Sequence, residues 1–149
     1  MTRRFEASTF IETSPEAVFD WISDHRNVPR VLDGVSRWEP LTRKTTGEGA
    51  RFDVAMKTLG VPLTAELELA EWRRPNRIAW RSLGGLISQR GAWDIAAADG
   101  GTRVSLTIDY EPPAAALGNL LAGPVERLAR SRLQSALDRL GEYVLEETA

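Results

Sequence analysis

The sequence contains no cysteine, and its 149 residues include a single histidine, His25. The absence of cysteine excludes disulfides, thiolate zinc sites, iron–sulfur clusters and a cysteine nucleophile together. With one histidine, a metal site would need carboxylates for its remaining ligands, and no group of acidic residues is expected to face the interior. We therefore expect no metal site and no cofactor.

Two further features are missing, namely a strong net charge and a long apolar run. The formal net charge is only −2, so no overall field would attract nucleic acid or an anionic membrane. No apolar run approaches the roughly 18 residues that span a bilayer, and the amino terminus lacks the apolar core of a signal peptide. We interpret the chain as a cytoplasmic protein that neither inserts into a membrane nor binds nucleic acid. The sequence leaves open whether it is a monomer or a homodimer.

Apolar and aromatic residues, by contrast, are well represented. Hydrophobic residues make up 42% of the chain, and there are five tryptophans. A chain of this length can bury a core of its own, and no repeat, linker or low-complexity segment divides it. We expect one domain over residues 1–149, with a large aromatic interior.

Alternation of apolar and polar residues predicts a sheet of about seven strands. Residues 3–12 show the period of two that is typical of a half-buried strand. The same pattern recurs along the chain after Gly34, interrupted by turn sequences such as Gly60-Val61-Pro62 and Asp99-Gly100-Gly101. These later strands are expected at Val35 to Arg43 and at 51–57, 63–69, 78–82, 87–95 and 103–110.

Helices are predicted on both sides of this run of strands. Ser14-Pro15-Glu16 has the composition of a helix start, because serine can cap free amides, proline suits the first turn and glutamate meets the positive helix end. A second short helix or turn follows Pro29 and ends at Asp33-Gly34. From residue 117 onward, apolar residues recur at three- and four-residue spacing, which predicts a long helix. Gly123-Pro124 should kink this helix or split it.

His25 and its neighbour Asp24 could form a general base with its orienting carboxylate. Adjacent residues at a helix end point about 100° apart, which disfavours a hydrogen bond between their side chains. Arg26 and Asn27 follow, as expected of an exposed helix end where the helix dipole favours a histidine. We interpret His25 as a bystander and Asp24 as a residue that caps the turn.

The order of predicted elements is strand, two short helices, six strands and a long helix. This order is similar to that of the helix-grip fold of the START/Bet v 1-like (SRPBCC) superfamily. The stretch IETSPEAVFDWISDHRNVPRVLDGVSRWEPL, residues 11–41, resembles the start of the polyketide cyclase/dehydrase and lipid-transport family. The matching positions are Ser14-Pro15-Glu16, Val18-Phe19, Ser23-Asp24, Pro29, Gly34-Val35 and Trp38. The resemblance implies an α+β fold in which a curved antiparallel sheet wraps around the C-terminal helix and encloses a central cavity.

By this resemblance, the cavity between sheet and helix binds or carries a hydrophobic or amphipathic small molecule, such as a lipid, a quinone or a polyketide. Alternation along the strands indicates which side chains face it, although each could instead be ordinary core. A few polar groups among them would orient the ligand. The predicted lining comprises Phe52, Met56, Leu67, Trp80, Ser82, Gln89, Trp93, Leu106 and Tyr110 from the sheet and Leu121, Val125 and Leu128 from the helix.

Two other functions stay open. A polyketide aromatase/cyclase or dehydratase could fold its substrate by shape and use Ser82, Gln89 and Tyr110 as polar groups. We find no complete catalytic set, so binding is expected in preference to catalysis. A macromolecular partner could instead bind an arginine-rich face, although pairing with nearby carboxylates explains that face more simply. Its arginines are Arg73, Arg74, Arg77, Arg81, Arg90, Arg127, Arg130, Arg132 and Arg139.

Overall fold

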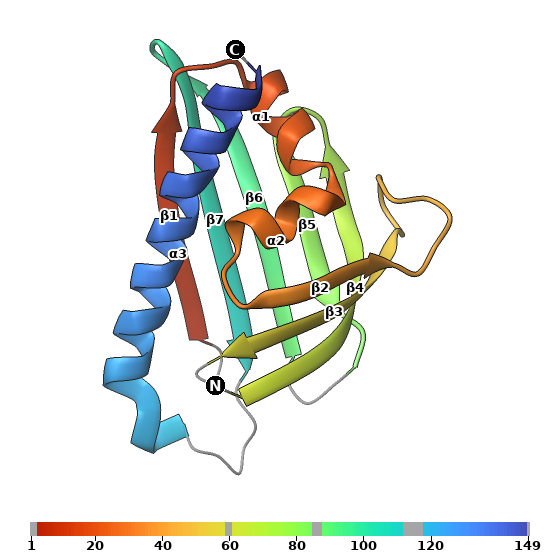
Figure 1. Ribbon diagram of the computed structural model, residues 1–149, viewed down its shortest axis with the longest axis vertical. Helices are drawn as coiled ribbons and strands as arrows, with labels where there is room; N and C mark the ends of the chain where they lie inside the picture. The colour runs from red at the N-terminus through yellow and green to blue at the C-terminus, as the bar shows by residue number, and fades with distance from the viewer. Residues whose placement is uncertain (1–2, 59–60, 85–87, 112–117, 149) are drawn as a thin grey trace.

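A computed structural model describes residues 3–58, 61–84, 88–111 and 118–148, without the side chains of 58–63 and 118–126. Its elements follow the predicted order (Figure 1). The first strand is followed by short helices and then by six more strands and one long helix. They are β1 (Arg3–Ile11), α1 (Pro15–Ile22), the 3-10 helix η1 (His25–Asn27), α2 (Val28–Val31), β2 (Val35–Pro40), β3 (Arg51–Thr58), β4 (Val61–Arg73), β5 (Arg77–Ser82), β6 (Ser88–Ala98), β7 (Gly101–Glu111) and α3 (Gly118–Thr148).

In the described residues, seven strands form a single antiparallel sheet with the order β1-β7-β6-β5-β4-β3-β2. The sheet curls into a half-barrel, and α3 and the α1–α2 segment lie on the same face of it (Figure 1). This architecture confirms the predicted α+β helix-grip fold.

Several predicted boundaries differ from the structure. β2 ends at Pro40 and not at Arg43, because its pairing with β3 stops at the partners Pro40 and Phe52. Val61 and Pro62, predicted as part of a turn, already pair with Thr58 and Lys57 in the β3–β4 ladder. Gly60 lies outside the described residues. The helix α3 runs without a break through Gly123-Pro124, so the alternative of two separate helices is wrong.

The core lies between the concave face of the sheet and the helices. The helix α3 contributes residues at three- and four-residue spacing, as an amphipathic helix on a core should. Leu137, Leu140 and Val144 are fully buried, and they belong to the same cluster as Phe5 and Leu106 of the sheet. The apolar stripe predicted for the long helix therefore packs on the sheet.

Shortening a buried leucine of α3 should destabilise the fold far more than shortening an exposed one. Leu140 is 0% exposed, whereas Leu145 on the same helix is 44% exposed. We expect Leu140→Ala to lower the free energy of unfolding by about 2–5 kcal/mol, and Leu145→Ala to change it by less than about 0.5 kcal/mol. Urea denaturation measures both. Equal effects would show that α3 does not pack on the sheet as described.

Candidate ligand-binding pocket

A small pocket lies between the concave face of the sheet and the segment α1–η1–α2. Its volume is about 40 Å³, room for a few water molecules. Four of the five tryptophans line it, and its polar side chains other than indole are those of Ser23, His25 and Thr45. The complete lining is Ile22, Ser23, His25, Val28, Leu32, Trp38, Thr45, Phe52, Leu69, Trp72, Ile78, Trp80 and Trp93. The pocket is thus almost wholly aromatic and aliphatic.

Two β-bulges turn two of these tryptophans inward. The pairing of β2 shifts between Val35 and Arg37, and that of β4 shifts between Leu69 and Glu71. An extra residue in a strand reverses the face on which all later side chains lie. Trp72 therefore shares the concave face with Leu69, and Trp38 shares it with Val35, although strict alternation would separate each pair.

Trp80 lies against the backbone of the neighbouring strand at Gly91, its partner in the β5–β6 ladder. A Cβ atom at Gly91 would come within 2.1 Å of the Trp80 ring. Only glycine leaves the space that this indole occupies. The space that Gly91 leaves is thus filled by a ring of the protein itself.

The aromatic rings make continuous contacts across the pocket. Trp38 packs edge-on against Trp80, with ring centroids 6.4 Å apart. Trp38 also contacts Phe52, with ring centroids 5.9 Å apart. Phe52 in turn contacts the imidazole of His25, with ring centroids 5.7 Å apart. Such offset and edge contacts are the arrangements that aromatic pairs favour. These ring contacts connect the side chains of the sheet to the side chain of His25 in η1.

His25 itself is half-buried in the pocket wall, contrary to the expectation of an exposed bystander. Its Nδ1 atom is buried and has no hydrogen-bond partner among the described residues. Asp24 caps η1 as predicted, because its carboxylate accepts from the Arg26 amide at 3.0 Å. The same carboxylate binds the Arg26 guanidinium at 2.7 and 2.9 Å, and this hydrogen bonding lowers the pKa of Asp24. Asp24 is therefore engaged by Arg26.

The residues predicted to line a cavity fall into separate places. Phe52, Trp80 and Trp93 line the aromatic pocket. Leu67 and Leu106 are buried in the core, and Met56 packs against it. The pocket lies beneath α1–η1–α2 and not beneath α3, where the prediction placed it. Leu128 is 39% exposed and is not among the pocket residues. The side chains of Leu121 and Val125 lie outside the described residues, and ligand contact by any of the twelve stays a prediction.

The three predicted polar groups gather elsewhere. Ser82, Gln89 and Tyr110 share an open depression of about 330 Å³ near the ends of β5, β6 and β7. The Ser82 hydroxyl accepts a hydrogen bond from the backbone N–H of Gln89 at 2.9 Å, and the Tyr110 ring stacks on Phe5 with centroids 5.4 Å apart. The three residues thus lie near one another, but they are not among the residues that line the aromatic pocket.

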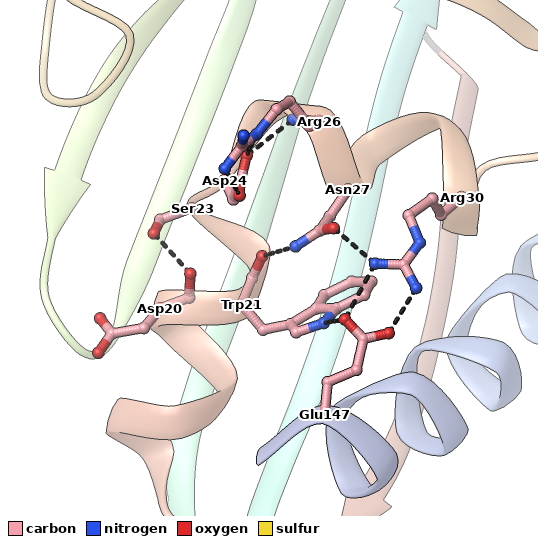
Figure 2. A network of polar contacts seen from close by, with 8 residues as sticks. All are labelled: Asp20, Trp21, Ser23, Asp24, Arg26, Asn27, Arg30 and Glu147. Atoms are coloured by element: carbon pink, nitrogen blue, oxygen red, sulfur yellow. Dashed lines mark hydrogen bonds and ion pairs between the residues drawn. The ribbon is translucent and has the colours of Figure 1, made fainter.

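The segment that covers the pocket is tied to α3 by one polar cluster (Figure 2). Arg30 of α2 donates to both carboxylate oxygens of Glu147 of α3, at 3.0 Å to Oε1 and by a short bond to Oε2. The same Oε1 accepts from the Trp21 indole at 3.1 Å. The Arg30 guanidinium also lies over the rings of Trp21 and Tyr143, 5.4 and 4.5 Å from their centroids. We call Trp21, Arg30, Tyr143 and Glu147 the clamp.

Two further contacts reinforce the clamp. Asn27 accepts from Arg30 at 2.8 Å and donates to the Trp21 carbonyl at 2.8 Å. On the other side of α2, Arg139 of α3 donates to the Val31 carbonyl at 2.8 Å and pairs with Asp33 at 3.2 Å. Arg30 and Val31, the last two residues of α2, are thus both bonded to side chains of α3.

Arginines of the middle strands pair with carboxylates on the outer face of the sheet. Arg77 bonds Glu71 and Asp94, each at 2.6 Å, and Arg81 bonds Glu68 at 2.8 Å. For Arg77 and Arg81, these contacts fit the simpler interpretation, in which the charges of the arginine-rich face are paired with nearby carboxylates. They lower the pKa of Glu68 and of Glu71, chiefly through hydrogen bonds from Arg81 and Arg77 respectively.

In residues 3–58, 61–84, 88–111 and 118–148, no group of three or more histidine, aspartate or glutamate side chains could hold a metal ion. In the same part of the chain, no helix has the length and apolar character needed to cross a bilayer.

Comparison with known proteins identifies the family. The chain belongs to the polyketide cyclase / dehydrase and lipid transport family, whose sequence profile matches residues 2–145. This confirms the resemblance seen in residues 11–41. Among curated proteins, none matches the chain.

Solved structures share the fold over almost the whole chain. The protein TTHA0849 from Thermus thermophilus has 28% identity and a TM-score of 0.84, covering 99% of this chain and 100% of its own. A START superfamily protein from Mycobacterium smegmatis has 17% identity and a TM-score of 0.73, with coverages of 96% and 97%. The Zhui aromatase/cyclase from a Streptomyces species has 20% identity and a TM-score of 0.68, with coverages of 99% and 93%.

Adding a methyl group at Gly91 should displace the Trp80 ring from its position against the backbone of β6. We expect Gly91→Ala to lower the free energy of unfolding by about 1–3 kcal/mol, as overpacking does, and to change tryptophan emission. Gly141→Ala on α3 is the control, because its Cβ would meet no atom closer than 3.8 Å and alanine favours a helix by up to about 1 kcal/mol. Unchanged stability and emission in Gly91→Ala would show that the Trp80 ring does not lie against Gly91 as described.

Removing the charge of Glu147 should weaken the clamp in a pH-dependent way. Hydrogen bonds from Arg30 and then Trp21 lower the pKa of Glu147, so its contribution to stability is complete above the ordinary titration range of glutamate and is lost as the pH falls through the lowered pKa. We expect Glu147→Gln to melt a few degrees lower than the native chain at neutral pH, and the difference to disappear in acid. Glu146→Gln, an exposed neighbour, controls for net charge. A difference independent of pH, or equal in both variants, would count against the clamp.

Proposed function

We propose that this protein binds or carries a hydrophobic small molecule with a planar, unsaturated ring system, in the pocket beneath α1–η1–α2. The observation that supports this is the pocket wall, to which Trp38, Trp72, Trp80 and Trp93 all contribute. Aromatic faces bind planar apolar molecules by stacking. Membership of a family that includes lipid-transport proteins supports the same use of the fold.

Binding requires the cover of the pocket to move. The pocket holds about 40 Å³, whereas sites for small molecules typically hold about 300–1,000 Å³. The cover is suited to such movement, since η1 has no buried residue and α2 has only Val31 buried. Segments with few buried apolar contacts open at a lower free energy than the core. The ligand would therefore enter by lifting η1 and α2, which breaks the bonds of Arg30 and Val31 to α3, while α3 stays packed on the sheet.

The polyketide aromatase/cyclase alternative is less well supported. Such an enzyme would need polar groups facing the substrate, and the three that the sequence suggested lie in a separate open depression. The aromatic pocket offers Ser23, His25 and Thr45 instead. The likeness to the Zhui aromatase/cyclase, at 20% identity, concerns the fold. Binding is thus the function that the geometry supports best.

Titration of tryptophan emission tests this proposal. The probes are palmitate, menadione and an anthraquinone, which represent a lipid, a quinone and a polyketide-like ring system. We expect saturable quenching by the planar probes. Trp38→Phe should weaken their binding roughly three- to tenfold, the loss expected from one aromatic contact. Phe10→Leu is the control, because Phe10 is 38% exposed and lies outside the pocket. Absence of saturable binding by every probe, or equal loss in both variants, would refute the proposal.

A further inference from the structure

We propose that His25 selects the ligand, by accepting a hydrogen bond at Nδ1 from a hydroxyl group carried on the planar ring system. The inference rests on the proposed function, because it names the chemical class that the same pocket would take: a phenol or enol in preference to a hydrocarbon or a carboxylate. It assigns to the only histidine of the chain a role in specificity.

The first support is the state of the Nδ1 atom. It is buried and lacks a partner in the part of the chain that the structure describes. A buried polar atom without a hydrogen bond is destabilising and uncommon, and it calls for an explanation. Two arginine nitrogens share this description, one in Arg37 and one in Arg139. Those two guanidinium groups pair with Asp53 and Asp33. Among the described residues, the imidazole of His25 forms no ion pair of this kind.

The second support is that the neighbouring carboxylate is already used. Asp24 accepts from the backbone and side chain of Arg26 at 2.7–3.0 Å. The ring of His25 instead contacts Phe52, with centroids 5.7 Å apart and planes inclined by 40°. Phe52 also belongs to the pocket lining. The imidazole thus belongs to the aromatic pocket wall, and none of the described groups forms a hydrogen bond with its Nδ1 atom.

The third support is the charge of the surroundings. In the described lining there is no aspartate, glutamate, lysine or arginine. A ligand carboxylate in this pocket would lose its water and would find no lysine or arginine to pair with, which is strongly unfavourable. A neutral imidazole protonated at Nε2 presents Nδ1 as an acceptor, and a neutral hydroxyl is the donor that matches it. A hydrocarbon would fit the aromatic wall but leave Nδ1 without a partner.

Three probes of one shape test the inference: naphthalene, 2-naphthol and 2-naphthoate, with binding measured by calorimetry. We expect the native chain to bind 2-naphthol about five- to tenfold more tightly than naphthalene, the worth of one hydrogen bond, and 2-naphthoate most weakly. In His25→Leu the preference for 2-naphthol should disappear. Ser23→Ala, which removes another polar group of the same pocket, should keep it.

Two further measurements separate recognition from a structural role. Because the chain has a single histidine, both ¹⁵N imidazole signals belong to His25, and their couplings to the ring protons distinguish Nδ1 from Nε2. The Nδ1 signal should shift upfield with 2-naphthol but not with naphthalene. Replacing an unpartnered buried polar group by an apolar one should not destabilise the fold. His25→Leu should therefore unfold at no lower urea concentration than the native chain.

The outcomes distinguish the two proposals. If neither naphthalene nor 2-naphthol binds, the aromatic pocket is not a ligand site and both proposals fail. If both bind equally and His25→Leu changes nothing, the pocket stands and the role of His25 is refuted. Tightest binding of 2-naphthoate would also refute it, because that would require a cationic site.

Discussion

The structure depends on one constraint, which is that the apolar concave face of a curled sheet has to be covered. The helix α3 covers the part of the face over β1, and α1–η1–α2 covers another part. The helix α3 and the segment α1–η1–α2 are far apart along the chain. Non-covalent contacts must therefore hold them together over the sheet. Arg30 and Glu147 supply these, with the rings of Trp21 and Tyr143 on which the guanidinium lies. The pocket is the space left where the short cover meets the sheet.

Much of the fold could be predicted from the sequence, because strand alternation and helix periodicity are local signals. The order of elements and the inward residues of the middle strands, such as Trp80 and Trp93, follow from them. Trp38 and Trp72 were missed as pocket residues, because each follows a bulge that reverses the face of the strand. A bulge adds one residue and leaves little trace in composition. The register of a neighbouring strand is needed to detect it.

His25 shows a second limit of sequence reasoning. Its neighbours Asp24 and Arg26 are polar and bond to each other, which makes the segment look exposed from end to end. The turn of η1 directs the imidazole of His25 toward Phe52 of the sheet. A single inward residue in a polar segment has no periodicity to reveal it. Family membership gives the fold, whereas the chemistry of the aromatic pocket comes from such individual placements.

The clamp also has a consequence for how the protein is made. Arg30 and Glu147 are 117 residues apart, and α3 follows all seven strands of the described chain. During synthesis, the tryptophan-bearing face of the sheet therefore emerges well before the helix that completes its cover. Contacts between such distant segments slow folding, and apolar strands that stay exposed before α3 packs on them favour aggregation. The nascent chain would thus be most dependent on chaperones between the release of β7 and the arrival of α3.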